Sequence, residues 1–189
     1  MSNFLQIMAR ASEARAGLLG GYFTDDELDQ PAYPLQLKGF DLIAEIKNRS
    51  PAEGQLALGG ERRADRALMY AEGGAAAISV LTEPNYFDGT LSHLSEVVDA
   101  IGDRALPVMR KDFLVSPVQV LESKAAGASG ILLIVAMLEG KHLTNMLDCA
   151  LEHDLFVLLE SFSEDDLDRS TQLVERPVYL DHARRTKLL

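Results

Sequence analysis

The fold of this chain is decided by five short apolar segments: LIAEIK (residues 42–47), AISVLTE (77–83), LPVMRK (106–111), ILLIV (131–135) and LFVLLE (155–160). Between these segments lie stretches that are each long enough for one helix, so the pattern is a repeated strand and helix. Strands that are apolar on both faces are typical of parallel sheets that helices cover. We therefore expect an α/β fold in which helices pack on a parallel sheet.

In a closed barrel of such units, the (β/α)8 TIM barrel, the active site lies at the carboxyl ends of the strands. Five units are fewer than eight, and Leu188 and Leu189 resemble the start of a further apolar run. We expect an N-terminal helical extension (residues 1–39) and the first five βα units of a TIM barrel (residues 40–189). Apolar side chains at helical spacing predict a helix over residues 4–19, which covers either the mouth or the floor of the barrel.

Composition places the chain among soluble cytoplasmic proteins. It has 189 residues, of which 47% are hydrophobic, and these can form one domain with a sizeable core. No apolar stretch approaches the roughly 18 residues of a membrane-spanning helix, and no signal peptide begins the chain. The net charge of -11 argues against nucleic acid as a partner. The single cysteine, Cys149, is expected on a helix that faces the core.

No metal site is predicted, because none of the four histidines has a metal-ligand spacing with another His or Cys. We expect all four to face solvent: His93, His142, His153 and His182. No nucleotide-binding glycine loop or serine-nucleophile elbow is present either.

Charged side chains close several of the predicted strands, where the active site of a barrel would lie. Glu45 and Lys47 are two residues apart, so both side chains point to the same face of their strand. Lys111 ends the third strand, and its neighbour Arg110 must point the other way. Glu160 follows an apolar strand, which suits a carboxylate to general-base work. These residues predict acid–base chemistry on an anionic substrate.

Each of these residues also has a plainer interpretation. Glu45 and Lys47 could be a structural ion pair, and Lys111 could be a surface lysine at a strand end. Glu160 could cap the following helix. The loop around Ser50 and Gly54 has free backbone amides that can hold an anion, but such loops are common after strands of this kind.

Four strings in order resemble the indole-3-glycerol-phosphate synthase family. They are IAEIK with SP (43–47 and 50–51), SVLTEP with YFDG (79–84 and 86–89), PVMRKDF (107–113) and ILLIVA (131–136). The resemblance covers residues 40–167 and implies an enzyme of tryptophan biosynthesis, a carboxy-lyase. Such an enzyme closes the ring of 1-(2-carboxyphenylamino)-1-deoxyribulose 5-phosphate to give indole glycerol phosphate, with release of CO2 and water and no cofactor.

The resemblance also implies roles for individual residues. Lys111 matches the general acid that protonates the sugar carbonyl, and Glu160 matches the base of the later dehydration. Glu45 matches a carboxylate that orients the aminophenyl portion. Lys47 matches a cation that holds the anionic substrate, and Ser50 a phosphate contact. The residues that form apolar walls around the aromatic ring of the substrate in this family match Phe87, Phe113 and Leu132.

Two departures keep other functions open. The family's motifs on its later strands are not in this sequence, and Glu160-Ser161-Phe162 replaces the usual Glu-Val/Ile-His/Asn. One alternative is a shortened, non-catalytic barrel homologue that acts as a binding or assembly partner. Another is a barrel enzyme for a different sugar phosphate. We expect the 189-residue chain by itself to be catalytically silent and to self-associate through open sheet edges.

Overall fold

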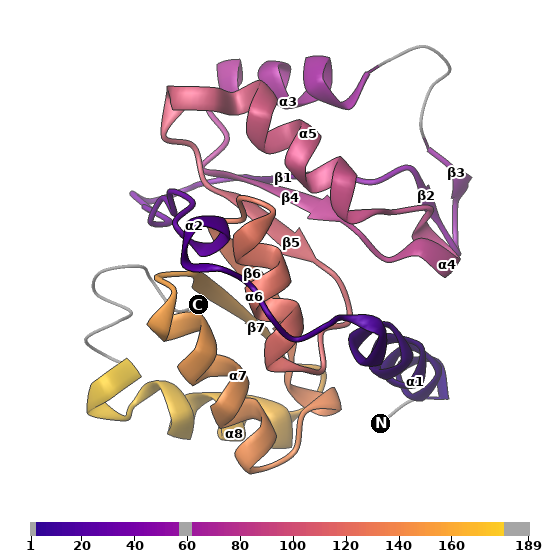
Figure 1. The fold of residues 1–189 in the computed structure, drawn as a ribbon, viewed down its shortest axis with the longest axis vertical. Coiled ribbons are helices and arrows are strands. Elements are labelled where there is room, and N and C mark those ends of the chain that lie inside the picture. Colours follow the sequence, from indigo (N-terminus) through magenta and orange to yellow (C-terminus); the bar gives the residue numbers. More distant parts are fainter. Residues whose placement is uncertain (1–2, 57–61, 180–189) are drawn as a thin grey trace.

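The computed structural model describes residues 3–56 and 62–179. Five parallel strands form one sheet in the order β1-β4-β5-β6-β7 (Figure 1). The strands are β1 (Ile43–Ile46), β4 (Ala77–Leu81), β5 (Val108–Lys111), β6 (Gly130–Ile134) and β7 (Phe156–Glu160). All five predicted strands are present, and the α/β architecture of the partial TIM barrel is confirmed.

Helices connect successive strands and pack against the sheet, and two further long helices precede and follow these units in the chain. The longer ones are α1 (Asn3–Leu18), α3 (Arg63–Glu72), α5 (Leu91–Ile101), α6 (Pro117–Ala125), α7 (Lys141–Glu152) and α8 (Glu164–Val174). Short elements lie between them: α2 (Asp25–Leu28), the ribbon of β2 (Arg49–Ser50) and β3 (Gly54–Gln55), α4 (Pro84–Phe87), η1 (Gly102–Arg104) and η2 (Val135–Met137). Helices α3 and α5 lie together over β1 and β4, and α7 packs on β7 (Figure 1).

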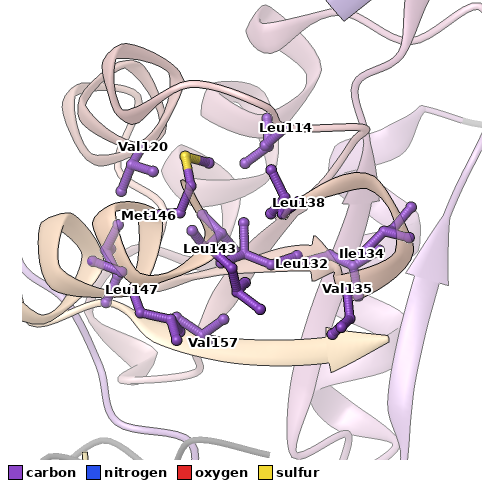
Figure 2. Close-up of a cluster of buried hydrophobic side chains, with 14 of the residues drawn as sticks. Leu114, Val120, Leu132, Ile134, Val135, Leu138, Leu143, Met146, Leu147 and Val157 are labelled. Carbon is purple, nitrogen blue, oxygen red and sulfur yellow. The ribbon is translucent and has the colours of Figure 1, made fainter. Parts of the chain in front are cut away.

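Two buried clusters hold these layers together. The larger joins α6 and α7 to β6 and β7, and Figure 2 shows Val120, Met146, Leu147 and Val157 among its side chains. In the smaller cluster, Ile78 of β4 packs with residues of α3 and α5. Burial of apolar area is the main stabilising term of such a fold, so these clusters fix the strands whose ends carry the charged residues.

Gly130 at the start of β6 makes room for a large ring. It pairs with Phe156 of β7, and a Cβ built at Gly130 would lie 2.5 Å from Cε1 of Phe156. Real Cβ atoms do not approach so closely, and Phe156 is fully buried, so the ring has little space to move.

Replacing Gly130 by alanine is expected to lower the free energy of unfolding by about 1–3 kcal/mol, because the core would be overpacked. Urea denaturation measures the change. Gly17→Ala is the matched control, because Gly17 lies in α1 and a Cβ added there would meet no packed atom within 4 Å. That substitution should raise stability by about 0.5–1 kcal/mol through helix propensity. Equal stability of Gly130→Ala and the unsubstituted protein would contradict the packing argument.

The N-terminal segment covers both ends of the sheet, where the sequence left mouth and floor as alternatives. Phe4 and Leu5 of α1 line a cavity at the carboxyl ends of the strands. At the other end, the backbone N–H of Tyr33 donates to Ser129 Oγ at 3.1 Å, just before β6, and Leu35 is fully buried. Helix α1 is therefore on the side of the predicted active site.

The other predictions have mixed outcomes. Cys149 lies on α7 against the core, and burial raises the pKa of its thiol to about 11. The solvent-facing assignment is wrong for His93, which is half-buried because α5 packs against α3, and burial lowers its pKa. His153 is also half-buried, whereas His142 is exposed. His182 and the expected strand start at residues 188–189 lie outside the described residues.

Within residues 3–56 and 62–179, no helix has the length and apolar character needed to cross a membrane.

Candidate active site

A cavity of about 930 Å³ opens at the carboxyl ends of the strands. Its lining comes from α1, from all five strands or the loops that follow them, and from α8. Every predicted site residue except Ser50 takes part in it: Glu45, Lys47, Phe87, Lys111, Phe113, Leu132 and Glu160. The carboxyl ends of parallel strands meet at one edge of a sheet, which is why residues so far apart in sequence converge here.

Glu45 holds two lysines at the cavity. Lys111 Nζ donates to one oxygen of Glu45 at 2.5 Å, and Lys47 Nζ lies 3.2 Å from the other. Burial raises the pKa of Glu45, but hydrogen bonds and charges from Lys111 and Lys47 outweigh it and leave the pKa below its usual value. Glu45 is therefore an anion at neutral pH. Lys47 also lies 3.7 Å from Glu53, an exposed carboxylate that sequence reasoning missed.

Arg110 points away from the cavity, as the alternation of side chains along β5 predicts. The residue is 4% exposed, and its guanidinium donates to Thr82 Oγ1 at 3.0 Å and to Glu122 Oε2 at 2.7 Å. It also donates to Asp112 Oδ2 at 3.1 Å. With Arg110 fixed on the outer face, Lys111 is held facing inward.

Asp112 joins this network to helix α1. Its carboxylate accepts hydrogen bonds from Arg15 at 2.7 Å and from Thr82 Oγ1 at 2.7 Å, in addition to the bond from Arg110. Burial raises the pKa of Asp112, but the charges of Arg110 and Arg15 outweigh it and hold the pKa below its usual value. The ion pair with Arg15 fixes α1 beside the end of β5, next to Lys111.

Aromatic rings form one wall of the cavity. Phe113 packs edge-on against Phe4 with centroids 5.9 Å apart, and Phe87 lies 6.2 Å from Phe113. Phe4 also meets Tyr86 edge-on at 5.5 Å. Such pairs suit a pocket for a flat ring. Phe4 was not predicted as a site residue, because its helical spacing does not tell where α1 docks.

Glu160 stands at the end of β7, paired in register with Ile134 of β6. The sequence left open that Glu160 caps the next helix. Instead Ser163 caps α8, since its hydroxyl accepts from the backbone N–H of Asp166 at 3.1 Å. The carboxylate of Glu160 is thus part of the cavity lining rather than of a helix cap.

Ser50 lies in the β2–β3 ribbon, outside the cavity lining. Its hydroxyl donates to Glu53 Oε2 at 3.2 Å and accepts from the Glu53 backbone N–H at 3.0 Å. The side chain is buried. A phosphate contact by Ser50 remains a prediction from the family resemblance.

Arg169 of α8 is a lining residue that sequence reasoning missed. Its guanidinium donates to the backbone oxygens of Val135 at 3.3 Å and of Leu138, and lies 3.6 Å from Asp166. It thereby ties α8 to the loop after β6. In the sequence it is one more arginine on an exposed helix, and no signal sets it apart.

Comparison with known proteins identifies the family. The model of the family described as "Indole-3-glycerol phosphate synthase" matches residues 28–178. A Nocardioides sp. protein of that name is 43% identical over 150 residues, covering 78% of this chain and 56% of its own length. The Methanopyrus kandleri protein is 46% identical over 123 residues, covering 65% of this chain and 47% of its own. The Aquifex aeolicus protein is 43% identical over 132 residues, covering 70% and 49%.

The chain thus spans about half the length of the curated relatives that it matches. The matched region contains all five strands and every residue that lines the cavity beyond α1. On this match, the chain belongs to the indole-3-glycerol phosphate synthase family.

Proposed function

We propose that this chain contributes the acid and base of an indole-3-glycerol phosphate synthase. The substrate would be 1-(2-carboxyphenylamino)-1-deoxyribulose 5-phosphate, and the product indole glycerol phosphate. The observation that carries the proposal is that Lys111, its partner Glu45, and Glu160 share one cavity with an aromatic wall. A sugar phosphate without an aryl group would make no ring contact with that wall. The wall therefore argues against a barrel enzyme for a different sugar phosphate.

In the first step, the ring carbon that bears the carboxylate attacks the sugar carbonyl carbon. A carbon–carbon bond forms, and the carbonyl oxygen takes a proton. Lys111 is the donor in this proposal, because Glu45 holds its ammonium at the strand end. The ring then loses its carboxylate as CO2, and the electrons of the broken bond restore the aromatic system. A positioned acid of this kind contributes typically 10²–10⁴-fold in rate.

In the later step, the new hydroxyl leaves as water and a proton is removed, which completes the indole. Glu160 is the base in this proposal. It enters the cavity from β7, two strands from Lys111 on β5, so acid and base approach the substrate from different sides. Lys47 offers a further positive charge for the anionic substrate, with Ser50 as the proposed phosphate contact.

Replacing Glu160 by glutamine is expected to slow turnover by about 10²–10⁴-fold, because the amide is nearly isosteric but cannot accept a proton. The loss should fall on kcat, with little change in the free energy of unfolding. Steady-state kinetics of a preparation that forms indole glycerol phosphate measure the first, and urea denaturation measures the second. Glu164→Gln, on an exposed carboxylate of the same region, is the control. A Glu160→Gln protein that unfolds readily and keeps its specific activity would make Glu160 a structural residue.

Self-association is the second proposal, and it concerns the edges of the sheet. Among the described residues, β1 and β7 each have only one strand neighbour. Near β1, Phe40 is 93% and Leu42 is 61% exposed. Open edges with apolar neighbours recruit other strands, so we expect oligomers at micromolar concentration. Sedimentation velocity over a concentration series tests this, and a monomer at every concentration would contradict it.

We propose that the substrate is a small phosphorylated molecule. We also propose that the protein is located in the cytoplasm. The single cysteine fits a reducing compartment. The net charge of -11 favours neither nucleic acid nor an anionic surface as partner.

A further inference from the structure

Phe162 lines the same cavity as Glu160, the proposed base. It follows Glu160 by two residues in the connection from β7 to α8, and its side chain lines the cavity. The residue is 61% exposed. A single exposed apolar side chain is ordinary on a protein surface, but this one borders a cavity that also has aromatic rings on another side.

The backbone at Phe162 is fixed. Its N–H donates to Asp166 Oδ2 at 3.3 Å, and Asp166 is buried. Ser163, the next residue, caps α8 through the N–H of Asp166. The backbone of Phe162 is therefore attached to the first turn of α8, and this fixes the position of its Cα beside the cavity.

Among the residues that the structure describes, Phe162 has no aromatic neighbour, unlike the other rings of the lining. Phe4, Phe87 and Phe113 pack against one another on the side of α1, α4 and β5. Within the described ranges, no ring contact involves Phe162. It stands after β7, with β6 between its strand and β5. One face of the lining thus holds a packed aromatic wall, and another holds a single ring that is open to solvent.

We propose that Phe162 is a specificity-determining residue that contacts the aryl group of the substrate from the β7 side of the cavity. An aryl ring seated on the wall of Phe87 and Phe113 would bring apolar area close to Phe162 and cover the exposed ring. Offset or edge contacts between rings favour such an arrangement over an aliphatic ligand. This inference rests on the proposed function, because the aryl group is that of the proposed substrate.

Residue 162 also separates this chain from the pattern that the family resemblance implies, where His or Asn follows the base by two residues. A phenyl ring cannot hydrogen-bond to the substrate, so its contribution here is apolar contact. The expected selectivity is for arylamino compounds over sugar phosphates that lack the ring.

The test is binding of two probes by isothermal titration calorimetry. N-(2-carboxyphenyl)glycine carries the aryl group without the sugar, and ribulose 5-phosphate carries the sugar phosphate without the ring. Phe162→Ala should weaken the aryl probe about tenfold and leave ribulose 5-phosphate unchanged. Phe162→Tyr keeps the ring and should bind the aryl probe within about twofold of the unsubstituted protein. Phe40→Ala removes an exposed ring outside the cavity and should change neither affinity.

The inference is overturned if Phe162→Ala binds the aryl probe as well as the unsubstituted protein does. It is equally overturned if the unsubstituted protein binds no aryl probe, or if both probes weaken together. The proposed function has a separate readout, the formation of indole glycerol phosphate. Selective loss of the aryl probe, together with no product when this chain is mixed with the part of the Nocardioides sp. relative that it does not cover, would support the role of Phe162 and reject the proposed reaction.

Discussion

Replacing Lys111 by alanine is expected to lower kcat by about 10²–10⁴-fold while binding of the substrate stays measurable. The physical reason is that a general acid acts mainly in the transition state, where the sugar carbonyl gains negative charge. Removal of Lys111 also leaves Glu45 with Lys47 as its remaining cationic partner. The measurement is kcat and KM with the arylamino-deoxyribulose phosphate in a preparation that forms indole glycerol phosphate.

The control for this substitution is Lys38→Ala. Lys38 is an exposed lysine before β1 that does not line the cavity, so its loss should leave kcat unchanged. Near-normal turnover by Lys111→Ala would remove Lys111 from the mechanism. The ion pair with Glu45 would then be structural, which is the plainer interpretation that the sequence allowed.

Replacing Arg110 by alanine is expected to lower the free energy of unfolding by about 3–5 kcal/mol, the range for breaking a buried ion pair by removing one partner. Arg110 holds Asp112 at 3.1 Å and Glu122 at 2.7 Å, and the Asp112 side chain is fully buried. Without Arg110, Asp112 keeps one cationic partner, Arg15. Urea denaturation followed by circular dichroism measures the loss.

Arg63→Ala provides the comparison. Arg63 pairs with Glu96 at 2.8 Å, but both side chains are about a third exposed. Exposed pairs contribute about 0–1 kcal/mol, so this substitution should change stability by less than about 1 kcal/mol. If the two substitutions prove equally mild, the buried network does not anchor the end of β5.

The parts of the site on the sheet could be predicted from the sequence because strand geometry is regular. The apolar runs locate the strands, and the polar residues that end them must meet at one edge of a parallel sheet. The alternation of side chains predicts that Lys111 and Arg110 cannot both point inward, and in the structure Lys111 meets Glu45 at the cavity whereas Arg110 meets Thr82 away from it. The same rule pairs Glu45 with Lys47, which lie 3.2 Å apart.

The parts that could not be predicted depend on how helices and loops dock. The spacing of α1 marks an apolar stripe, but it does not place Phe4 beside Phe113 or Arg15 beside Asp112. Those contacts join residues roughly a hundred positions apart in the sequence. Arg169 was missed for the same reason, since its partners are backbone oxygens that any residue carries.

The central claim is that Lys111 and its cavity perform the ring closure. It is tested most directly by mixing this chain with the part of the Nocardioides sp. relative that the chain does not cover, and by assaying indole glycerol phosphate. The chain alone and the relative's part alone measure the background. We predict product from the mixture that contains the unsubstituted chain, and at most about a hundredth of that rate when the chain carries Lys111→Ala. Equal rates from the two mixtures, or no product from a mixture in which sedimentation shows both parts bound, would contradict the account.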